Sequence, residues 1–334
     1  MKMLWMAAVM VAASVAAQAQ TLENVKRAGE VRCGVEPGLA GFSNVDSKGE
    51  WHGLDVDICR AVASVALGDP KKVKFVALTP QTRFTALQSG EIDLLTFDTT
   101  WTLARETTAA LQFTGVDFYD GQGFMVRSDS GIDNAKRLDG ATVCLRPGTV
   151  TELNLSDFQR VNKFKVQPVL IELLPQVMDA FLSGRCDAYT GDLSALASIR
   201  SGLVKPENVR ILPEVISKEP LGPSVRSNDS QWFNLVRWTL IAMIAAEEYG
   251  VTQGSVDAML KSDNPDVQRL LGVGNTLGES LGSTNDWAVK IIRAVGNYGE
   301  SFERNMGAGS RLGLPRGLNA QWRNGGLMYA PPIR

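Results

Sequence analysis

Residues 98–105, DTTWTLAR, bring carboxylate, hydroxyl and guanidinium groups together at the end of an apolar stretch. Thr100 and Arg105 lie where a helix is expected to begin, and a helix N-terminus offers free N–H groups and a favourable dipole to an anion. Arg105 can hold a carboxylate through two parallel hydrogen bonds, and Thr100 can donate its hydroxyl. The segment therefore predicts a carboxylate site, although a threonine helix cap followed by a solvated arginine would give the same pattern.

Residues 146–152, RPGTVTE, form a second segment with similar chemistry. Pro147 and Gly148 end a predicted strand, and Gly148 lets the backbone approach a ligand closely. Thr149 and Glu152 have the spacing of a capping box at the start of the next helix. We therefore expect a second helix start that favours anions, with ordinary capping as the simpler explanation.

Asp192 follows a predicted strand in the segment YTGDLS and could accept hydrogen bonds from an ammonium group. A turn or capping aspartate is the alternative interpretation. Two donor-rich helix starts and one carboxylate complement a free α-amino acid, whose carboxylate would meet Arg105 and Thr100 and whose ammonium would meet Asp192. Both charges of the zwitterion would then be satisfied, as burial requires.

The elements that place these residues alternate between strands and helices in two sets. The first set has strands at 31–36, 72–78 and 91–97 and helices at 53–67 and 79–90, and the second has strands at 140–148, 164–171 and 185–192 and helices at 149–160 and 173–184. This order predicts mostly parallel sheets, whose ligands bind beyond the carboxyl ends of the strands. ALQSGEID at 86–93 and AFLSGRCD at 180–187 match, which suggests two similar lobes with a cleft between them.

The N-terminus predicts export. Lys2 is the only charge before Glu23, and Ala17-Gln18-Ala19 fits a small-x-small cleavage site, so we expect a signal peptide at 1–19, cleaved after Ala19, rather than a membrane anchor. Without Lys2 the formal net charge changes from −2 to −3, which gives no reason to expect nucleic acid as a partner. A hydrophobic content of 44% is that of a globular protein, and we expect a soluble mature chain.

The cysteine and histidine counts limit the possible chemistry. The four cysteines are Cys33, Cys59, Cys144 and Cys186. An even number in an exported chain predicts disulfides, and three connectivities are possible. The sequence has no Cys-x-x-Cys pair, and its single histidine, His52, lies in a predicted turn. We therefore expect no metal site and no cofactor.

Longer segments carry a family resemblance over nearly the whole mature chain. They are GVEPGLAGF with GLDVDICRAVA, PQTRFTALQSGEIDLLTFDTTWTLARE, FTGVDFYDGQGFMV, CLRPGTVTELNL, GRCDAYTGDLSAL and the tail GNYGESFERNMGAG with GLNAQWRNGGLMYAPPIR. In these segments the chain resembles the periplasmic substrate-binding proteins of polar amino acid ABC transporters. It is most similar to the general L-amino acid-binding members of that family.

The resemblance implies a two-lobed α/β fold of the type II periplasmic-binding-protein class. Lobe 1 would comprise residues 20–123 and 219–334, with an extended helical C-terminal region, and lobe 2 would comprise residues 124–218. A hinge would lie where the chain crosses between them, and the ligand would close the lobes. The closed form, expected to be a monomer, would dock on the membrane permease of an ABC transporter.

The resemblance also assigns ligand-binding positions. By position these are Thr100 and Arg105 for the carboxylate, Gly148, Thr149, Val150 and Thr151 for lobe-2 contacts to that carboxylate, Asp192 and the backbone of Asp98 for the ammonium, and Glu36, Leu39, Arg83 and Arg146 for the side chain. Leu39 stands where many relatives stack an aromatic ring, which argues against a cationic, stacking ligand. We expect Arg83 and Arg146 to favour Glu, Gln, Asp or Asn, unless both are simply solvated.

One disulfide inside each lobe is implied by the same resemblance, Cys33 with Cys59 and Cys144 with Cys186, because a bridge between lobes would oppose hinge motion. Two other functions remain open. An enzyme on this fold, such as a dehydratase or lyase, would need a general acid or base in the cleft, and His52 is predicted away from it. A sensor domain that binds the same ligand would differ only in its partner. We expect a transport protein and not an enzyme.

Overall fold

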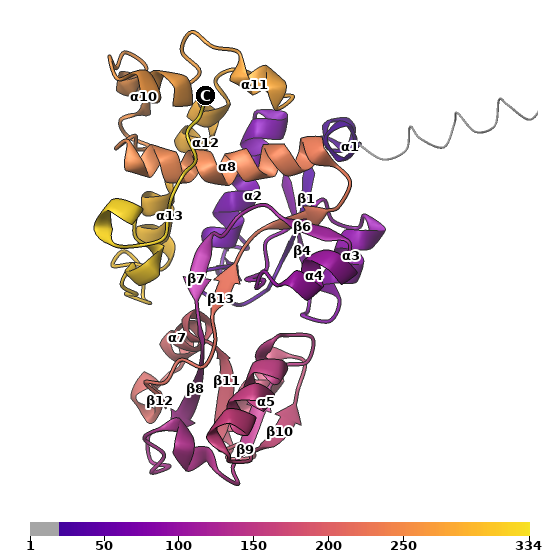
Figure 1. Ribbon diagram of the computed structural model, residues 1–334, viewed down its shortest axis with the longest axis vertical. Helices are drawn as coiled ribbons and strands as arrows, with labels where there is room; N and C mark the ends of the chain where they lie inside the picture. Colours follow the sequence, from indigo (N-terminus) through magenta and orange to yellow (C-terminus); the bar gives the residue numbers. More distant parts are fainter. Residues whose placement is uncertain (1–19) are drawn as a thin grey trace, which may run out of the picture.

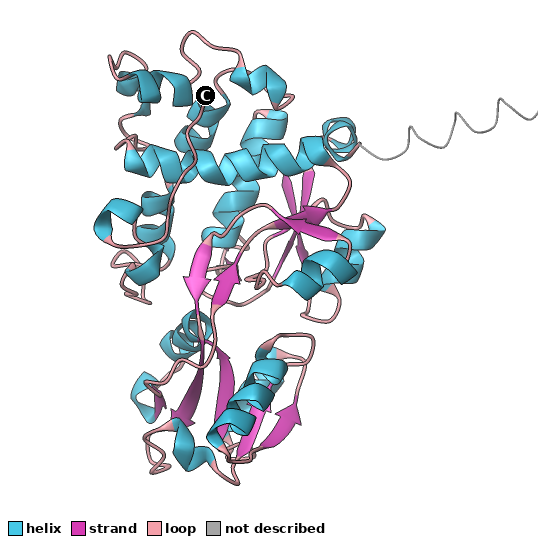
Figure 2. Cartoon of the chain, in the orientation of Figure 1, coloured by secondary structure: helices cyan, strands magenta, loops and turns pink. Residues whose placement is uncertain are grey.

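The computed structural model describes residues 20–334 as two lobes joined by a narrow two-stranded ribbon (Figure 1). The predicted signal peptide and its cleavage site lie outside the described residues. No helix in residues 20–334 is long and apolar enough to span a membrane. Figure 2 shows strands in the centre of each lobe with helices around them.

Lobe 1 is built on a five-stranded sheet in the order β4-β1-β5-β14-β6. Its strands are β1 (Val31–Val35), β4 (Val73–Ala77), β5 (Leu94–Leu95), β6 (Leu111–Phe113) and β14 (Ser224–Arg226). Strand β1 pairs in parallel with β4 and β5, as the β-α-β-α-β order predicted, whereas β14 runs antiparallel to β5 and β6. The chain thus leaves lobe 1 after β6 and returns to its sheet as β14.

The helices of lobe 1 follow from its apolar spacing. They are α1 (Thr21–Ala28), α2 (Leu54–Leu67), α3 (Arg83–Ser89) and α4 (Leu103–Thr108). The predicted apolar face of α2 is buried, and the helix ends at Gly68, whose left-handed φ of 74° lets its N–H reach the carbonyl of Ser64. A short hairpin, β2 (Asn44–Val45) with β3 (Trp51–His52), precedes α2. His52 is therefore in a strand and not in the predicted turn.

Lobe 2 has a second five-stranded sheet, in the order β10-β9-β11-β8-β12. Its strands are β8 (Gln122–Arg127), β9 (Thr142–Leu145), β10 (Gln167–Leu170), β11 (Ala188–Asp192) and β12 (Val209–Ile211), and its helices are η1 (Ala135–Leu138), α5 (Thr151–Asn162), α6 (Leu174–Leu182), α7 (Leu193–Gly202) and η2 (Pro206–Asn208). Two separate apolar clusters form its core, one containing Phe124 and Leu155 and the other containing Phe181 and Leu196.

The two similar segments, 86–93 and 180–187, have the same role in the two lobes. Asp93 accepts hydrogen bonds from the backbone N–H and the guanidinium of Arg32 at the start of β1. Asp187 accepts from the backbone N–H and the hydroxyl of Thr142 at the start of β9. In each lobe the aspartate after the helix stop thus fixes the start of a parallel strand, β1 or β9, so the sequence match reflects a repeated structural unit.

Both disulfides have the predicted pairing. Cys33 of β1 is joined to Cys59 of α2, and Cys144 of β9 is joined to Cys186 just before β11. All four sulfurs belong to fully buried residues. Each bridge therefore ties one strand of a sheet, β1 or β9, to another element of the same lobe.

The ribbon between the lobes consists of β7 (Phe118–Asp120) and β13 (Glu219–Leu221), which pair antiparallel. Leu221 also forms a bridge to Thr100, so the ribbon touches the segment that follows β5. A chain that crosses twice through a pair of short strands can bend there without disturbing either sheet. These crossings lie where the hinge was predicted.

The C-terminal region covers lobe 1. It contains α8 (Ser230–Glu248), α9 (Val256–Met259), α10 (Pro265–Leu270), α11 (Leu277–Ser280), α12 (Trp287–Val295), α13 (Tyr298–Asn305), η3 (Gly317–Asn319) and η4 (Trp322–Asn324). Its apolar side chains, such as Trp232 and Trp287, share one core with α1, α2 and β1. The predicted packing of this helical extension on lobe 1 is confirmed, and Figure 1 shows α8 lying across α2.

The extension also holds the ribbon from outside. Asn319 accepts a hydrogen bond from the backbone N–H of Tyr119 at 2.6 Å and donates one to the carbonyl of Tyr119 at 3.1 Å. Tyr298 donates to the carbonyl of Asp117 at 2.7 Å. Asn319 and Tyr298 are both buried, so the tail is firmly attached to the strand by which the chain leaves lobe 1.

Several predicted elements are shorter than expected, including those that correspond to α3, β5 and α5. Helix α3 begins at Arg83 rather than at residue 79, because Thr79 and Thr82 form a hydrogen-bonded turn before it. The predicted strand at 91–97 is extended only as Leu94–Leu95, although residues 92–97 are all buried. Helix α5 begins at Thr151 rather than at residue 149. Each difference moves polar residues from a regular element into a loop at the cleft.

Candidate functional site

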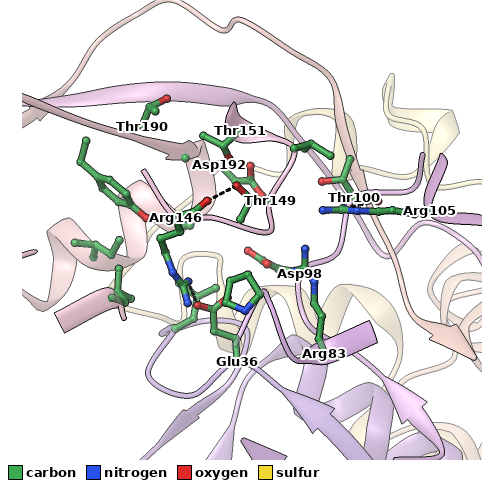
Figure 3. A pocket seen from close by; sticks show the side chains of 18 residues that line it. Glu36, Arg83, Asp98, Thr100, Arg105, Arg146, Thr149, Thr151, Thr190 and Asp192 are labelled. Atoms are coloured by element: carbon green, nitrogen blue, oxygen red, sulfur yellow. Dashed lines mark hydrogen bonds and ion pairs between the residues drawn. The ribbon is translucent and has the colours of Figure 1, made fainter. Parts of the chain in front are cut away.

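A pocket lies between the lobes, beyond the carboxyl ends of β1, β5, β9 and β11 (Figure 3). Its lining contains all the residues predicted to bind a ligand except Gly148. The lining residues are Glu36, Leu39, Pro80, Arg83, Asp98, Thr100, Arg105, Arg146, Thr149, Val150, Thr151, Leu174, Tyr189, Thr190, Gly191, Asp192, Ala195 and Ile199. The carbonyl of Gly148 still takes part in the site, because it accepts a hydrogen bond from Arg83.

Some lining residues were missed by the sequence reasoning. Thr190 and Gly191 come just before Asp192 in β11, so recognition of that strand exit could have included them. Ala195 and Ile199 are four residues apart on α7 and therefore share one face of the helix. Pro80 and Leu174 had no signal in the sequence, since they reach the pocket only through the way the lobes meet.

Arg105 is held in place by its own segment. The backbone N–H of Arg105 donates to the hydroxyl of Thr102, which caps α4, and its Nη1 donates to the carbonyl of Thr100 at 2.8 Å. The guanidinium lies 5.3 Å from the ring centre of Phe84. Burial lowers the pKa of Arg105, and Asp192 and Glu219 act against that shift. The predicted threonine cap therefore exists at Thr102, but Arg105 is buried in the pocket rather than solvated.

Thr100 faces a carboxylate of the ribbon. Its hydroxyl donates to Oε2 of Glu219 at 2.6 Å, and Asn154 of lobe 2 donates to Oε1 of the same side chain at 2.7 Å. All of Glu219 is nearly inaccessible to solvent. Thr100 is thus fixed in orientation by a residue that the sequence did not single out, because the two are 119 positions apart.

The predicted capping box at Thr149 and Glu152 is wrong. The hydroxyl of Thr149 donates to the carbonyl of Arg146, and α5 begins at Thr151 with Val150 at its N-cap and no side-chain cap. Gly148 has a left-handed φ of 78°, and a Cβ there would lie 3.0 Å from the carbonyl oxygen of Pro80. The first N–H groups of α5 are therefore free of a side-chain cap, and the turn before them touches lobe 1.

Asp192 ends β11 and has no capping hydrogen bond to α7, which begins directly after it. Burial raises its pKa well above the usual range, and the neighbouring carboxylates Asp120 and Glu219 raise it further, while Arg105 opposes them. Asp120 in β7 accepts hydrogen bonds from the backbone and hydroxyl of Ser194. Negative charge therefore gathers where the ribbon meets lobe 2, which favours a cation there.

Asp98 follows β5 in an unusual backbone conformation. Its φ is 36°, a left-handed value that is uncommon for a residue other than glycine. The backbone N–H of Asp98 is hydrogen-bonded to Asp55, a buried carboxylate at the start of α2. Burial raises the pKa of Asp98 well above its usual range, and Glu36 and Asp192 add to the shift. The backbone at this position is thus held away from regular structure by a buried side chain.

Arg83 is buried and the side chain of Arg146 is only 12% exposed, so the alternative that they are simply solvated is wrong. Arg83 is 3% exposed, lies about 5 Å from the rings of Phe84 and Phe97, and donates to the carbonyl of Gly148 across the cleft at 3.2 Å. Burial and the neighbouring Arg105 lower the pKa of Arg83 to about 9.

Arg146 pairs with Glu36 of lobe 1 and donates from its Nε to the carbonyl of Glu172 at 2.9 Å. Burial lowers the pKa of Arg146, but Glu36 outweighs that effect and the net shift is upward.

His52 lies outside this pocket. Its ring is 3.2 Å from Asp46, and both side chains are largely exposed. The two line a broader groove that runs beside the pocket and shares Ile199 with it. Within the described part of the chain, no group of three His, Cys, Asp or Glu side chains is arranged to hold a metal ion.

The arrangement can bind a small zwitterion. Arg105 and Thr100 lie on one side of the pocket in Figure 3, with Asp192 and the 149–151 turn facing them from lobe 2. A carboxylate between Arg105 and the start of α5 would meet a guanidinium and free backbone N–H groups. An ammonium beside Asp192 would meet the negatively charged end of the ribbon.

Comparisons with known proteins agree with this geometry. The family model for bacterial extracellular solute-binding proteins, family 3, matches residues 31–254. The general L-amino acid-binding periplasmic protein AapJ of Rhizobium johnstonii is 53% identical over 330 residues, which cover 98% of this chain and 97% of that protein. The glutamate/glutamine/aspartate/asparagine-binding protein BztA of Rhodobacter capsulatus is 52% identical over 320 residues, covering 96% of this chain and 95% of BztA.

A solved structure is similar over nearly the whole fold. It is an ABC transporter periplasmic binding protein from Brucella ovis with glutathione bound, 54% identical in sequence. It matches with a TM-score of 0.92 and covers 94% of this chain and 99% of that one.

Proposed function

The chain belongs to the bacterial extracellular solute-binding proteins of family 3, and from that premise we propose that it captures free L-amino acids in the periplasm. It would deliver them to the membrane permease of an ABC transporter. The observation that carries the proposal is the opposed placement of Arg105 and Asp192 in one interlobe pocket. Each is a charged group in a poorly solvated place, and an α-amino acid supplies the missing partner to both.

The ligand head group would be held from both lobes. Arg105, the backbone N–H of Thr100 and the N–H groups of the 149–151 turn would bind the carboxylate, since the hydroxyl of Thr100 donates to Glu219. Asp192 and the backbone of Asp98 would bind the ammonium. An ammonium next to Asp192 would favour the ionised form of that carboxyl group, whose pKa is otherwise raised. Binding would therefore pull the two lobes toward each other through a single small molecule.

The side chain would extend toward Glu36, Leu39, Arg83 and Arg146. Two buried arginines favour acidic and amide side chains, so we propose Glu, Gln, Asp and Asn as the preferred ligands. The name of the 52% identical relative BztA points to the same four amino acids.

A γ-glutamyl peptide is a second candidate ligand. The similar structure from Brucella ovis contains glutathione, whose γ-glutamyl group carries a free α-amino acid head. In this chain the pocket adjoins a groove of about 860 Å³ lined by Gly38, Met178, Ile199 and Arg311 among others. A peptide continuing from a glutamyl side chain would find room there.

Closure would take place about β7 and β13. We propose lobe 1 as residues 20–123 and 219–334 and lobe 2 as residues 124–218, moving as two bodies. We also propose that the chain acts as a monomer, without nucleic acid, and that export removes residues 1–19. N-terminal sequencing of the protein recovered from the periplasm should begin at Gln20.

Titration calorimetry on unfolded and refolded, ligand-stripped protein tests the proposal. The titrants are the twenty L-amino acids, several D-isomers and glutathione. Arg105→Ala and Asp192→Asn should each weaken every amino acid at least about 30-fold, because a charge-assisted contact is lost in a poorly solvated site. Arg160→Ala, which removes an exposed arginine of α5 outside the pocket and the groove, is the matched control and should bind normally. Loss of only some ligands in either variant would contradict a shared head-group site.

The same samples separate binding from catalysis. After prolonged incubation, nuclear magnetic resonance spectra of the ligand should be unchanged if the protein only binds it. Conversion of the ligand would favour a dehydratase or lyase. Uptake by vesicles that contain the permease would distinguish a transport receptor from a sensor domain.

A further inference from the structure

The charged residues that line the pocket are balanced. Glu36, Asp98 and Asp192 are carboxylates, and Arg83, Arg105 and Arg146 are guanidiniums. In the proposed function, Arg105 and Asp192 meet the charges of the ligand head group. The remaining charges lie around the end of the pocket that would receive the ligand's side chain. That side chain is acidic, neutral or basic according to which amino acid is bound.

Glu36 and Arg146 make a direct ion pair across the cleft. Glu36 follows β1 in lobe 1, Arg146 follows β9 in lobe 2, and Nη1 of Arg146 donates to Oε1 of Glu36. Their side chains are 6% and 12% exposed. Figure 3 shows this pair on the side of the pocket away from Thr100 and Arg105. The pair therefore closes the side-chain end of the cleft.

The backbone of each partner is anchored, but the contact between their charged ends is light. Arg146 is held by Glu172 and by Thr149, and the carbonyl of Glu36 accepts from Ser43. Among the described residues, the carboxylate of Glu36 has a hydrogen bond from Arg146 and from no other side chain. A pair with so few bonds regains little beyond the cost of removing two charges from water.

The pair also occupies the room that a side chain needs. With the pair closed, the pocket has a volume of about 50 Å³. That volume holds a few water molecules, at roughly 10–15 Å³ each on this measure. A long side chain that extends to this end of the pocket would therefore meet Glu36 and Arg146.

We infer that the Glu36–Arg146 pair is a displaceable internal counter-ion pair that lets one pocket accept side chains of either charge. An acidic or amide side chain takes Arg146, a cationic side chain takes Glu36, and a small neutral side chain leaves the pair intact. The inference rests on the proposed function and extends its ligands to basic L-amino acids. Arg83 lies beside the pair and repels cations, so acidic ligands bind more tightly than basic ones.

Glu36→Gln and Arg146→Gln should change specificity in opposite directions. The test is calorimetry at pH 7 with L-glutamate, L-lysine and L-alanine. Glu36→Gln should strengthen the binding of glutamate and weaken the binding of lysine, each by about tenfold. Arg146→Gln should weaken glutamate and strengthen lysine by a similar factor. The binding of alanine should weaken in both single variants, because each leaves one charge of the closed pair without its partner, and it should weaken less in the double variant, which leaves no such charge.

Two charges outside the pocket serve as controls. Arg160→Gln and Asp157→Asn remove one charge of each sign from α5 in lobe 2, where both side chains are exposed and neither lines the pocket or the adjoining groove. Neither should change the ratio of glutamate to lysine affinity. If the controls change the ratio of glutamate to lysine affinity as much as the test variants do, the cause is a general electrostatic effect and not the Glu36–Arg146 pair.

The outcomes separate this inference from the proposed function. If the wild type binds amino acids but both test variants weaken glutamate and lysine alike, the displaceable pair is refuted and the proposed function stands. If the wild type binds no α-amino acid, both fail together. Arg146→Lys keeps the charge with little loss of packing, and it should retain the wild-type preference if Arg146→Gln does not fold.

Discussion

The two lobes share one α/β unit but differ in what covers it. In both, a glycine ends a helix, an aspartate three residues later holds one strand, β1 or β9, and a disulfide fixes that strand. Lobe 1 has one large apolar cluster shared with the C-terminal helices and a smaller one that contains Leu87 and Phe113, whereas the core of lobe 2 consists of two small clusters. The repeated features thus build the unit, and the surroundings decide how firmly each copy is held.

The site reflects the same difference. The charged groups of lobe 1, such as Arg83 and Arg105, are buried. The charged groups of lobe 2, Arg146 and Asp192, are partly exposed, although Thr151 and Thr190 beside them are buried. We therefore expect lobe 1 to act as the fixed side of the cleft and lobe 2 as the moving side.

The largest expected effect comes from the disulfides. Their loops span 26 and 42 positions in lobes 1 and 2, so loss of a bridge should cost about 3.5 and 4 kcal/mol respectively. Cys144→Ala with Cys186→Ala should leave lobe 2 partly unfolded, since its core is small, while Cys33→Ala with Cys59→Ala should leave one cooperative transition. Denaturant unfolding of the ligand-free variants checks both. If the variant that lacks the lobe 1 disulfide is less stable than the variant that lacks the lobe 2 disulfide, the idea that lobe 1 is held more firmly is contradicted.

The second prediction concerns the ribbon between the lobes and how its carboxyl groups make stability depend on pH. Burial raises the pKa of Asp120 in β7 to about 6 and that of Asp117 just before it to about 7. A folded carboxyl with a raised pKa binds more protons than its unfolded form, so stability should fall as pH rises from about 4 to 7.

Asp120→Asn should reduce this loss in the free energy of unfolding by up to about 3 kcal/mol, the equivalent of roughly two pKa units. Denaturant unfolding of ligand-free protein at several pH values measures it. A wild type that gains stability over this range, or an Asp120→Asn variant with the wild-type slope, would show that Asp120 is ionised throughout.

The third prediction compares the two strand-holding aspartates. Asp93 accepts from a backbone N–H and a guanidinium, whereas Asp187 accepts from a backbone N–H and a hydroxyl. Asp93→Asn should therefore cost about 2 kcal/mol and Asp187→Asn about 1 kcal/mol. Unfolding midpoints in urea give both values. Equal costs would mean that Arg32 contributes little to lobe 1.

The smallest effect should be the same in both lobes. Gly90 and Gly184 end equivalent helices with φ of 78° and 85°, and an added Cβ at either would meet only ordinary contacts with an arginine side chain. Gly90→Ala and Gly184→Ala should each cost about 1 kcal/mol through backbone strain alone. Thermal unfolding of the two variants measures both costs. A clear difference between them would mean that the two copies are less alike than their backbones suggest.

Sequence reasoning succeeded where the signal was local. The repeated ALQSGEID and AFLSGRCD segments, the buried face of α2 and the strand exits at Arg105 and Asp192 all follow from short-range patterns. It failed where one local sequence pattern was compatible with two different structures. Thr149 had the spacing of a cap, but its hydroxyl turns back to the carbonyl of Arg146 and the helix begins two residues later, at Thr151.

Long-range pairing was beyond the sequence. Glu36 and Arg146 were each expected at the side-chain end of the pocket, but their ion pair depends on how far the lobes close. Glu219 received no role, because its partners Thr100 and Asn154 come from different lobes. Contacts of this kind have no periodicity to reveal them, and they make up much of the charged network around the cleft.

The attachment of Asn319 to Tyr119 couples the tail to the strand that bends. If β7 changes its course when the lobes close, the η3 turn must travel with it or lose two hydrogen bonds to its backbone. Three residues further on, Trp322 is partly exposed and lies against Tyr329. An indole in that position should change its fluorescence as the turn moves. The tail would thus carry a built-in optical signal of ligand capture, far from the ligand itself.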